Sequence, residues 1–355
     1  WKKNNKSKLN LCKTFSTTCD NWLHTKEEQV YITVEQHPRI EDLDYVVVSI
    51  DKENLEPTIL TKIDNPFPDC VFHPYDSCNG LILLLYDNIW GKDPDISQEA
   101  IWNPTTNKLK IIPTSPFTLD PYKNYKKKIC NHFGFGYDST CNDYKVIRFL
   151  ERYDRSLAVA ELYSLKTNSW KHVYFNPISL YPYGDPFAKI HANGTYYRLD
   201  IVDLNYIDSN SIRPFNFATE EFDSLYIPIP PTDKLNRYKF CHMKLVEYWG
   251  SLGFLASTSM WVDGVKYNDF ELWVWDDANL LWRLESTFLV NKMHSFMGLF
   301  ENDKLFYLQL GLGGHLTVQD CAMNKVMNLS NVCSQRVGKI FPFVENYVSL
   351  SSYGK

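Results

Sequence analysis

The sequence predicts an all-β protein, a kelch-like β-propeller of about six four-stranded blades. Two observations support this prediction. Aromatic residues make up 15% of the 355 residues, a composition that suits sheets better than helices. Two kinds of strand-forming segment also alternate along the chain with a period of roughly 50 residues, which is typical of propeller repeats.

The first kind of segment is a tight turn followed by an apolar strand. Asn-Gly and Asn-Asp pairs tolerate the positive φ angles of such turns, and aromatic and β-branched residues follow them. We expect Leu81–Leu85 to form an inner strand of the first complete blade, and residues 343–352 to contain a last turn and strand. The turns begin near positions 79, 142, 193, 249, 302 and 346.

The second kind of segment is a strand, a polar turn and another strand, often with an aromatic residue. The last repeat lacks this segment because the chain ends at Lys355, so we expect strands from 27–36 and 45–60 to complete its blade. Such closure would remove exposed sheet edges. The propeller would then span 27–355 after a peripheral lead-in, 1–26. Because outer strands are poorly marked, five and seven blades stay open. The segments of this kind are 100–113, 160–173, 213–228, 270–286 and 316–330.

Charge and cysteine usage limit the function classes. A net charge of −5 argues against a general nucleic-acid binder, which needs a basic face, and suits a basic protein partner. The nine cysteines include no C-x-x-C pair, and no histidine spacing suggests a metal, so we expect a reduced, cytosolic protein with no metal and no cofactor. No apolar run approaches the ~18 residues of a membrane span.

Cys78 is a candidate nucleophile, because it precedes the Asn79-Gly80 turn and follows His73 in the same segment. A catalytic cysteine needs a base and an activating environment, and this segment contains no known nucleophile motif. Equivalent turn positions in other repeats hold Ala192 and Tyr248. We therefore interpret Cys78 as a small structural residue.

Other chemistry-bearing patterns also favour structure over catalysis. The glycines of 311–315 and 133–136 lack the Lys-Ser/Thr and following helix of a phosphate loop, and strand-like sequence follows both. The acidic pairs Glu220–Glu221 and Asp276–Asp277 fall on polar turns of the repeat, where we interpret them as solvated. We therefore expect a protein without catalytic activity.

Two charged segments are candidate partner-binding sites, because loops on a rigid propeller commonly carry specificity. An acidic segment, 91–99, is expected to form a loop between strands and to meet a basic protein through Asp93, Asp95 and Glu99. A basic segment lies in a long insertion between the first two repeats, and its candidate residues are Tyr122, Lys123, Tyr125, Lys126, Lys127 and Lys128.

Five motifs occur in order over about 100 residues, and together they resemble the F-box-associated domain of plant F-box proteins. They read Cys-Asn-Gly-Leu, Trp-Asn-Pro-x-Thr, Gly-Phe-Gly-Tyr-Asp, Asn-Asp-Tyr-Lys-Val and Tyr-Ser-Leu-x-Thr-x-Ser-Trp. The resemblance assigns structural roles to Cys78, Asn79, Gly80, Trp102, Asn103, Pro104, Gly134, Gly136, Tyr137, Asp138, Asp143, Tyr144, Lys145 and Trp170.

Within that family the sequence is most similar to the S-locus F-box proteins of self-incompatible plants. The resemblance implies a non-catalytic substrate receptor of an SCF-type ubiquitin ligase, located in the pollen-tube cytosol. Its target would be a non-self S-ribonuclease, or an unrelated protein if the chain belongs to another branch. The F-box, which would bind a Skp-type adaptor and cullin, is not recognisable in this chain.

Two other functions compete with this interpretation. A propeller enzyme would need carboxylates, tyrosines or histidines that converge from several blades. A glycan-binding propeller would use the abundant tryptophan and tyrosine residues, 10 and 23 in number, as stacking platforms.

Overall fold

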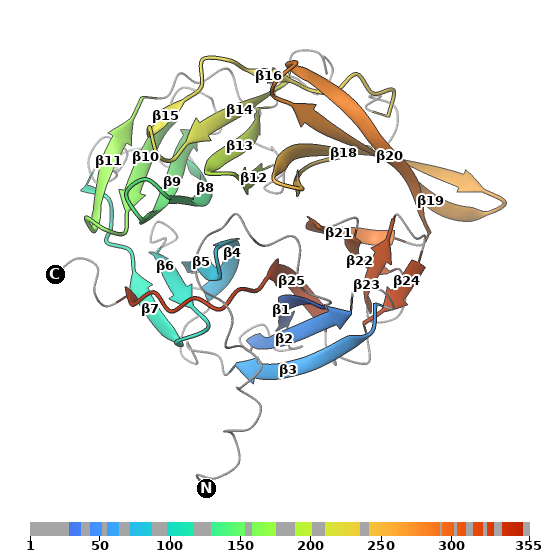
Figure 1. Cartoon of the computed structure of the whole chain (residues 1–355), viewed down its shortest axis with the longest axis horizontal. Coiled ribbons are helices and arrows are strands. Elements are labelled where there is room, and N and C mark those ends of the chain that lie inside the picture. Colours follow the sequence, from blue (N-terminus) through green and yellow to red (C-terminus); the bar gives the residue numbers. More distant parts are fainter. Residues whose placement is uncertain are drawn as a thin grey trace, which may run out of the picture.

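Antiparallel strands dominate the chain, and they form six sheets arranged in a ring (Figure 1). The sheets confirm the predicted all-β propeller. This computed structural model describes residues 28–36, 43–51, 55–63, 72–86, 98–116, 129–152, 158–174, 189–200, 210–234, 241–291, 293–301, 304–309, 315–321, 325–329 and 336–350.

Five blades are consecutive along the chain. The first contains β4 (Phe72–Cys78), β5 (Leu81–Tyr86), β6 (Gln98–Asn103) and β7 (Lys108–Ile111). The second contains β8 (Ile129–Asp138), β9 (Asp143–Arg152), β10 (Ala158–Ser164) and β11 (Ser169–Val173). The third contains β12 (Lys189–Ala192), β13 (Thr195–Asp200), β14 (Ser211–Asn216), β15 (Glu221–Phe222) and β16 (Ile227–Pro228).

The fourth blade has the longest strands. It contains β17 (Cys241–Tyr248), β18 (Ser251–Val262), β19 (Val265–Asp276) and β20 (Leu281–Asn291). The fifth contains β21 (Met293–Glu301), β22 (Lys304–Gln309), β23 (His315–Asp320) and β24 (Lys325–Asn328).

The sixth blade, here called the closing blade, joins the two ends of the chain. Its innermost strand is β25 (Arg336–Pro342), which pairs antiparallel with β1 (Glu28–Gln36). Strands β2 (Leu43–Asp51) and β3 (Pro57–Ile63) continue the sheet outwards. The predicted completion of the last blade by N-terminal strands is therefore confirmed.

The innermost strands follow one another around the ring axis in the order β4, β8, β12, β17, β21 and β25, and β25 contacts β4 again. Within the described residues, six clusters of buried apolar side chains each lie between two adjacent blades. The core is thus a closed series of inter-blade layers, with each sheet buried on both faces.

The burial of both faces explains the continuous apolar run in β5. Leu81 and Leu83 pack towards the second blade, whereas Ile82 and Leu84 pack towards the closing blade. A strand that faces water on one side would alternate apolar and polar residues instead. The expected turn lies at Asn79-Gly80, but β4, before the turn, is the innermost strand and β5 is the second.

One expected strand is wrong. Residues 343–350 follow β25 but form no strand, although five of these eight residues are aromatic or aliphatic. The reason is topological. The outward edge of β25 already pairs with β1, so the segment after it has no free sheet edge to join.

Candidate functional site

The strand order gives the propeller two different faces. In each of the five consecutive blades, one tight connection joins the innermost strand to the second and another joins the third to the fourth. Because the strands are antiparallel, both connections lie at one end of the ring, which we call the turn face. At the opposite end, the loop face, the second strand leads to the third and each blade leads to the next.

The turn face holds the Cys-Asn-Gly motif. Asn79 and Gly80 both adopt positive φ, 48° and 78°, as a two-residue hairpin turn of this kind requires. Cys78 lies in the apolar core between the first and second blades, together with Leu81 and Tyr144. A buried thiol among apolar side chains behaves as a small hydrophobic group.

Residues 343–350, here called the C-terminal strap, contact this turn. A Cβ added to Gly80 would lie 2.0 Å from the Val344 carbonyl oxygen, so the strap approaches too closely for any side chain there. The Asn346 amide donates hydrogen bonds to the Asn79 carbonyl oxygen (2.7 Å) and the Tyr144 hydroxyl (2.8 Å). The strap therefore links the closing blade to the first two blades.

The Trp-Asn-Pro-x-Thr motif holds the other side of the strap. The buried Asn103 amide nitrogen donates to the carbonyl oxygens of Asn346 (2.9 Å) and Val348 (3.0 Å). The Thr105 hydroxyl accepts from the Asn346 backbone N–H at 2.9 Å. The Asn103 side-chain oxygen accepts from the backbone N–H groups of its own turn, at Thr105 and Thr106.

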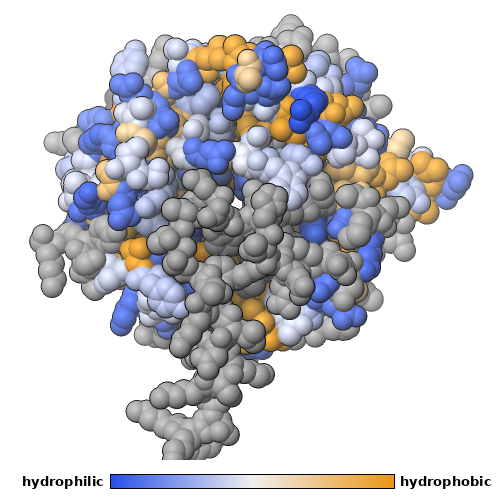
Figure 2. Space-filling model, in the orientation of Figure 1, coloured by the Kyte–Doolittle hydropathy of each residue, from blue (hydrophilic) through white to orange (hydrophobic). Residues whose placement is uncertain are grey.

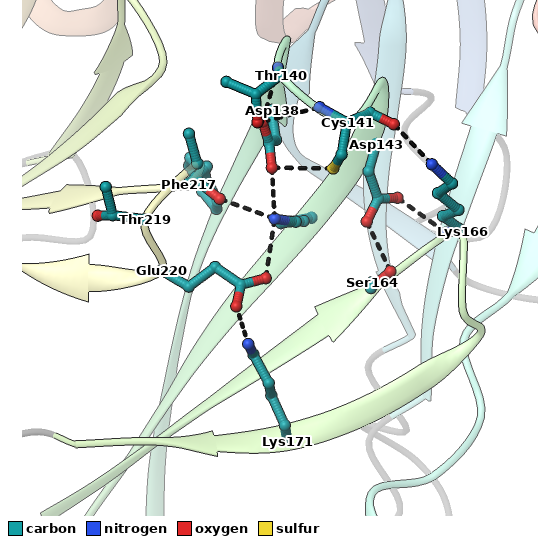
Figure 3. A network of polar contacts seen from close by, with 12 residues as sticks. Asp138, Thr140, Cys141, Asp143, Ser164, Lys166, Lys171, Phe217, Thr219 and Glu220 are labelled. Atoms are coloured by element: carbon teal, nitrogen blue, oxygen red, sulfur yellow. Dashed lines mark hydrogen bonds and ion pairs between the residues drawn. The ribbon is translucent and has the colours of Figure 1, made fainter.

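The motifs of the second blade form a polar network on the same face (Figure 3). The Lys145 ammonium, almost fully buried, lies 2.7 Å from Asp138 Oδ2 and 2.8 Å from Glu220 Oε1, and donates to the Phe217 carbonyl oxygen. Burial alone would raise the pKa of Asp138, but hydrogen bonds from Cys141, Lys145 and Thr140 hold it well below its usual range.

Glu220 is thus not a solvated turn residue, as its sequence context suggests. Its carboxylate pairs with Lys145 of the neighbouring blade and with Lys171, so it links the third blade to the second (Figure 3). The interpretation based on sequence was wrong because a polar turn was assumed to face only water. Glu221, beside it, is exposed.

Asp143 and Trp170 complete the motif contacts in the second blade. Asp143 accepts hydrogen bonds from the Ser164 hydroxyl (2.6 Å) and the Lys166 backbone N–H (2.8 Å). The Trp170 indole donates to the Pro113 carbonyl oxygen at 2.6 Å, which joins the second blade to the first.

The two glycines of Gly-Phe-Gly-Tyr-Asp allow close packing between the second and third blades. A Cβ on Gly134 would lie 2.4 Å from the Tyr196 ring, and one on Gly136 would lie 2.1 Å from the Phe217 ring. Neither distance is possible without displacement of a large buried aromatic ring. Tyr137 in the same motif packs against Tyr144 and donates to Asn142.

A second group of polar residues lies on the innermost strands, and we call it the axis cluster: Tyr75, Asp76, Lys189, His191 and Lys339. Lys189 Nζ lies 3.5 Å from the Tyr75 ring centroid and 3.4 Å from Asp76 Oδ2, and Lys339 Nζ lies 5.5 Å from the same ring centroid. Burial lowers the pKa of His191 to about 4, and the nearby Asp76 opposes this shift.

The fourth blade carries several exposed apolar side chains. The hairpin of β18 and β19 pairs as far as Val262 and Val265, and it projects from the ring at the right of Figures 1 and 2. Trp261 near its tip is 71% exposed. Further exposed apolar residues of this blade are Trp249, Met260, Val262, Leu280, Leu281, Leu284 and Leu289.

Neither a metal centre nor a membrane helix is found in the part of the chain that the structure describes. No three His, Cys, Asp or Glu side chains there are grouped to hold a metal ion. Within the same residues, no helix has the length and apolar character needed to cross a bilayer.

Residues 29–310 match the family model of the F-box associated beta propeller domain. This match covers most of the chain. The chain belongs to the F-box-associated propeller family.

The relatives of this F-box-associated propeller include plant F-box proteins. It is 28% identical over 169 residues to "Putative F-box only protein 15" of Arabidopsis thaliana, covering 44% of this chain and 41% of that protein. It is 24% identical over 249 residues to F-box protein CPR1 of the same plant, covering 61% of this chain and 55% of that protein. The chain spans about half the length of the curated relatives it matches.

Solved structures with a similar fold have lower sequence identity to this chain than the plant relatives have. One is an oligogalacturonate lyase in complex with manganese, with a TM-score of 0.40 and 11% identity over 84% of this chain and 78% of the lyase. Another is the β-propeller domain of the Trilobed protease from Pyrococcus furiosus, with a TM-score of 0.37 and 9% identity over 86% and 82%.

The structure corrects one expected partner-binding residue of the propeller. Glu99 does not lie in a loop: it is the second residue of β6, is 1% exposed, and lies 3.5 Å from the Arg148 guanidinium of the second blade. Arg148 also binds Glu161 at 2.6 Å. Glu99 therefore stabilises the blade interface and cannot meet a partner.

The other expected contact residues lie outside the described residues. Asp93 and Asp95 belong to the connection from β5 to β6, and residues 122–128 belong to the connection from β7 to β8. Both connections leave their strands at the loop face. Their role in binding stays a prediction.

The axis cluster was not predicted from the sequence. Its residues come from three segments that are distant in the chain, in strands β4, β12 and β25. The one available signal was a lysine in each of two short strands, Lys189 in β12 and Lys339 in β25, because a buried lysine is uncommon without a partner.

Proposed function

We propose that this F-box-associated propeller is the substrate-recognition domain of an SCF-type ubiquitin ligase, and that it holds the target without catalysing a reaction itself. The observation that carries the proposal is the family match over residues 29–310. The names of the plant relatives, which are F-box proteins, support it. In such an assembly a Skp-type adaptor and a cullin bind through an F-box in the cytosol, while the propeller presents the target.

We further propose that the target binds at the loop face. The five family motifs lie on the turn face, where their polar groups form contacts within and between blades. Residues used in this way cannot vary to suit different targets. The connections at the opposite end, the loop face, are of the kind that usually carries specificity on rigid scaffolds.

For the target itself, we propose a basic secreted protein of the S-ribonuclease class. The net charge of −5 supports this choice, as does the similarity of the motifs to the S-locus F-box group. Opposite charges would chiefly accelerate encounter and discriminate among partners. A general F-box receptor for an unrelated target is the alternative.

Reconstituted ubiquitination tests the proposed class. The chain would be fused behind an established plant F-box and assembled with the Skp-type adaptor, cullin and ubiquitin-conjugating enzymes. Pollen or style extract supplies the targets, and mass spectrometry identifies proteins ubiquitinated only when the propeller is present. S-ribonucleases among them would support the branch. Reproducible unrelated targets would support only the class, and the absence of any propeller-dependent target would contradict it.

A charge reversal tests the proposed contact loop. The double variant Asp93→Lys/Asp95→Lys should weaken binding of an S-ribonuclease about tenfold at low salt and less at high salt, because salt screens exposed charges. Glu99 is left unchanged, since its substitution would break the buried contact with Arg148. Equal affinity of variant and wild type at every salt concentration would exclude this loop as the contact.

A further inference from the structure

Two lysines from different blades converge at the ring axis. Lys189 is the first residue of β12 and Lys339 lies within β25. In the ring, β25 is next to β4, and β12 is separated from β4 by β8. Both ammonium groups approach the ring of Tyr75 on β4, at 3.5 and 5.5 Å from its centroid. The fold therefore holds two positive charges close together in its centre.

Backbone hydrogen bonds fix both lysines. Lys189 Nζ donates to the Phe133 carbonyl oxygen at 2.7 Å, and Lys339 Nζ donates to the Pro74 carbonyl oxygen at 2.6 Å. The Tyr75 hydroxyl accepts from the Phe133 backbone N–H at 3.3 Å, which fixes the ring that both ammonium groups approach. A ligand would find these groups already ordered, which lowers the entropic cost of binding.

The positive charge of this cluster is only partly balanced. Asp76 is the one carboxylate among the described residues that pairs with either lysine, and it lies 3.4 Å from Lys189, farther than a short charge-assisted hydrogen bond. Its other oxygen accepts from the Ser77 backbone N–H. No carboxylate of the described residues lies within ion-pair distance of Lys339, although an ammonium has three donors.

The pKa of Lys339 reflects the unfavourable burial of two neighbouring positive charges. Burial lowers the pKa of Lys339 to about 8, and repulsion from Lys189 adds to the effect while Asp76 opposes it. Buried cations are normally paired, so a bound anion would compensate the charge of the two lysines.

We propose that Lys189 and Lys339 form a binding site at the ring axis for a small oxyanion, a phosphate or carboxylate group. The two ammonium groups supply the positive charge and the hydrogen-bond donors. The occupant is either a free ion or an acidic group presented by a bound protein. This site does not depend on the proposed ligase function.

Anion titration of the purified chain tests the proposal. Thermal unfolding would be followed with increasing inorganic phosphate, acetate or chloride at constant ionic strength. We expect phosphate to raise the unfolding midpoint in a saturable manner, and chloride to leave it unchanged. A response to phosphate alone favours a phosphate group, and a comparable response to acetate favours a carboxylate.

Variants locate the site. Lys339→Met and Lys189→Met should each weaken phosphate binding at least tenfold, as expected for the loss of one charge-assisted contact. Lys62→Met, on the outer strand β3, removes the same charge from an exposed position and should leave phosphate binding unchanged. Absence of a phosphate response in the wild type, or an equal response in all variants, would overturn the proposal.

A measurement on the unmodified protein covers the case in which the variants fail to fold. Amine acetylation followed by mass spectrometry reports the reactivity of each lysine. Phosphate should slow the acetylation of Lys339 and Lys189 at least fivefold relative to Lys62. Equal rates with and without phosphate would show that the two lysines serve only to join the blades.

Discussion

Two turns of the propeller share the same local construction. Each joins the third strand of its blade to the fourth, and each begins with a tryptophan and an Asn or Asp: Trp102-Asn103 in the first blade and Trp275-Asp276 in the fourth. In both, the Asn or Asp Oδ1 accepts two backbone N–H groups of its own turn, at 3.0 and 3.3 Å in one and at 3.0 and 3.1 Å in the other. Both turns end on a residue with positive φ.

Their surroundings differ completely. Asn103 is fully buried, and its amide nitrogen donates two hydrogen bonds to the C-terminal strap. The hydrogen bonds of Asp276 are exposed and stay within its own turn. The local sequence therefore explains why an Asn or Asp starts the turn, but only the strap explains why position 103 needs an amide.

Removal of the C-terminal strap should have the largest effect, because it makes the surroundings of the Trp102-Asn103 turn similar to those of the Trp275-Asp276 turn. Deleting residues 343–355 leaves the amide of Asn103 without its two acceptors and removes the buried Leu350 from the core. We expect a loss of about 5 kcal/mol in the free energy of unfolding, from unpaired polar groups and lost apolar burial. Urea unfolding measures it, and a loss below about 1 kcal/mol would show that the strap is not needed for closure.

A matched pair of substitutions should show that the two turns differ in their contribution to stability. Asn103→Asp keeps the cap on the turn but places a carboxylate against two carbonyl oxygens, so it should cost about 4 kcal/mol. Asp276→Asn keeps the cap in an exposed turn and should change stability by less than about 0.5 kcal/mol. Chemical denaturation of both variants gives the difference, and similar costs would refute the role of the strap.

Two glycines provide a smaller test of the same contact. Gly80 and Gly264 have nearly equal φ, 78° and 77°, but a Cβ on Gly80 would meet the Val344 carbonyl oxygen, whereas nothing lies within 4 Å of one on Gly264. Gly80→Ala should cost about 3 kcal/mol and Gly264→Ala about 1 kcal/mol, the latter from backbone strain alone. Equal costs in thermal unfolding would mean that the strap moves aside freely.

Between pH 6.5 and 4, acid should destabilise the axis through His191. The pKa of His191 is about 4 in the folded chain, whereas the ordinary value of a histidine is 6.5. Between these two values the unfolded chain binds more protons than the folded chain. The free energy of unfolding therefore falls as the pH drops from 6.5 to 4. We expect His191 to contribute about 2 kcal/mol of the loss between pH 7 and 4.5. His191→Gln should flatten this part of the pH profile of urea unfolding, and an unchanged profile would contradict the role of this histidine.

Much of the propeller could be predicted from sequence because its strands and turns obey local rules. Asn79, Asn142 and Asn193 all adopt the positive φ that their turn positions require. The continuous apolar run of β5 follows from burial on both faces. Glu99 was misplaced because charged residues are rarely buried, and the guanidinium that allows its burial comes from another blade.

The sequence by itself determined the repeat, the turn chemistry and the family, since each depends on residues close together in the chain. Only the tertiary structure decided the acceptors of the Asn346 amide nitrogen, which lie more than 200 positions away, and the meeting of Lys189 with Lys339 at the axis. Such contacts leave no periodic pattern in the sequence, because closing the ring brings together segments that no local rule relates. The same closure places the Trp102-Asn103 turn beneath the strap and leaves the Trp275-Asp276 turn in solvent.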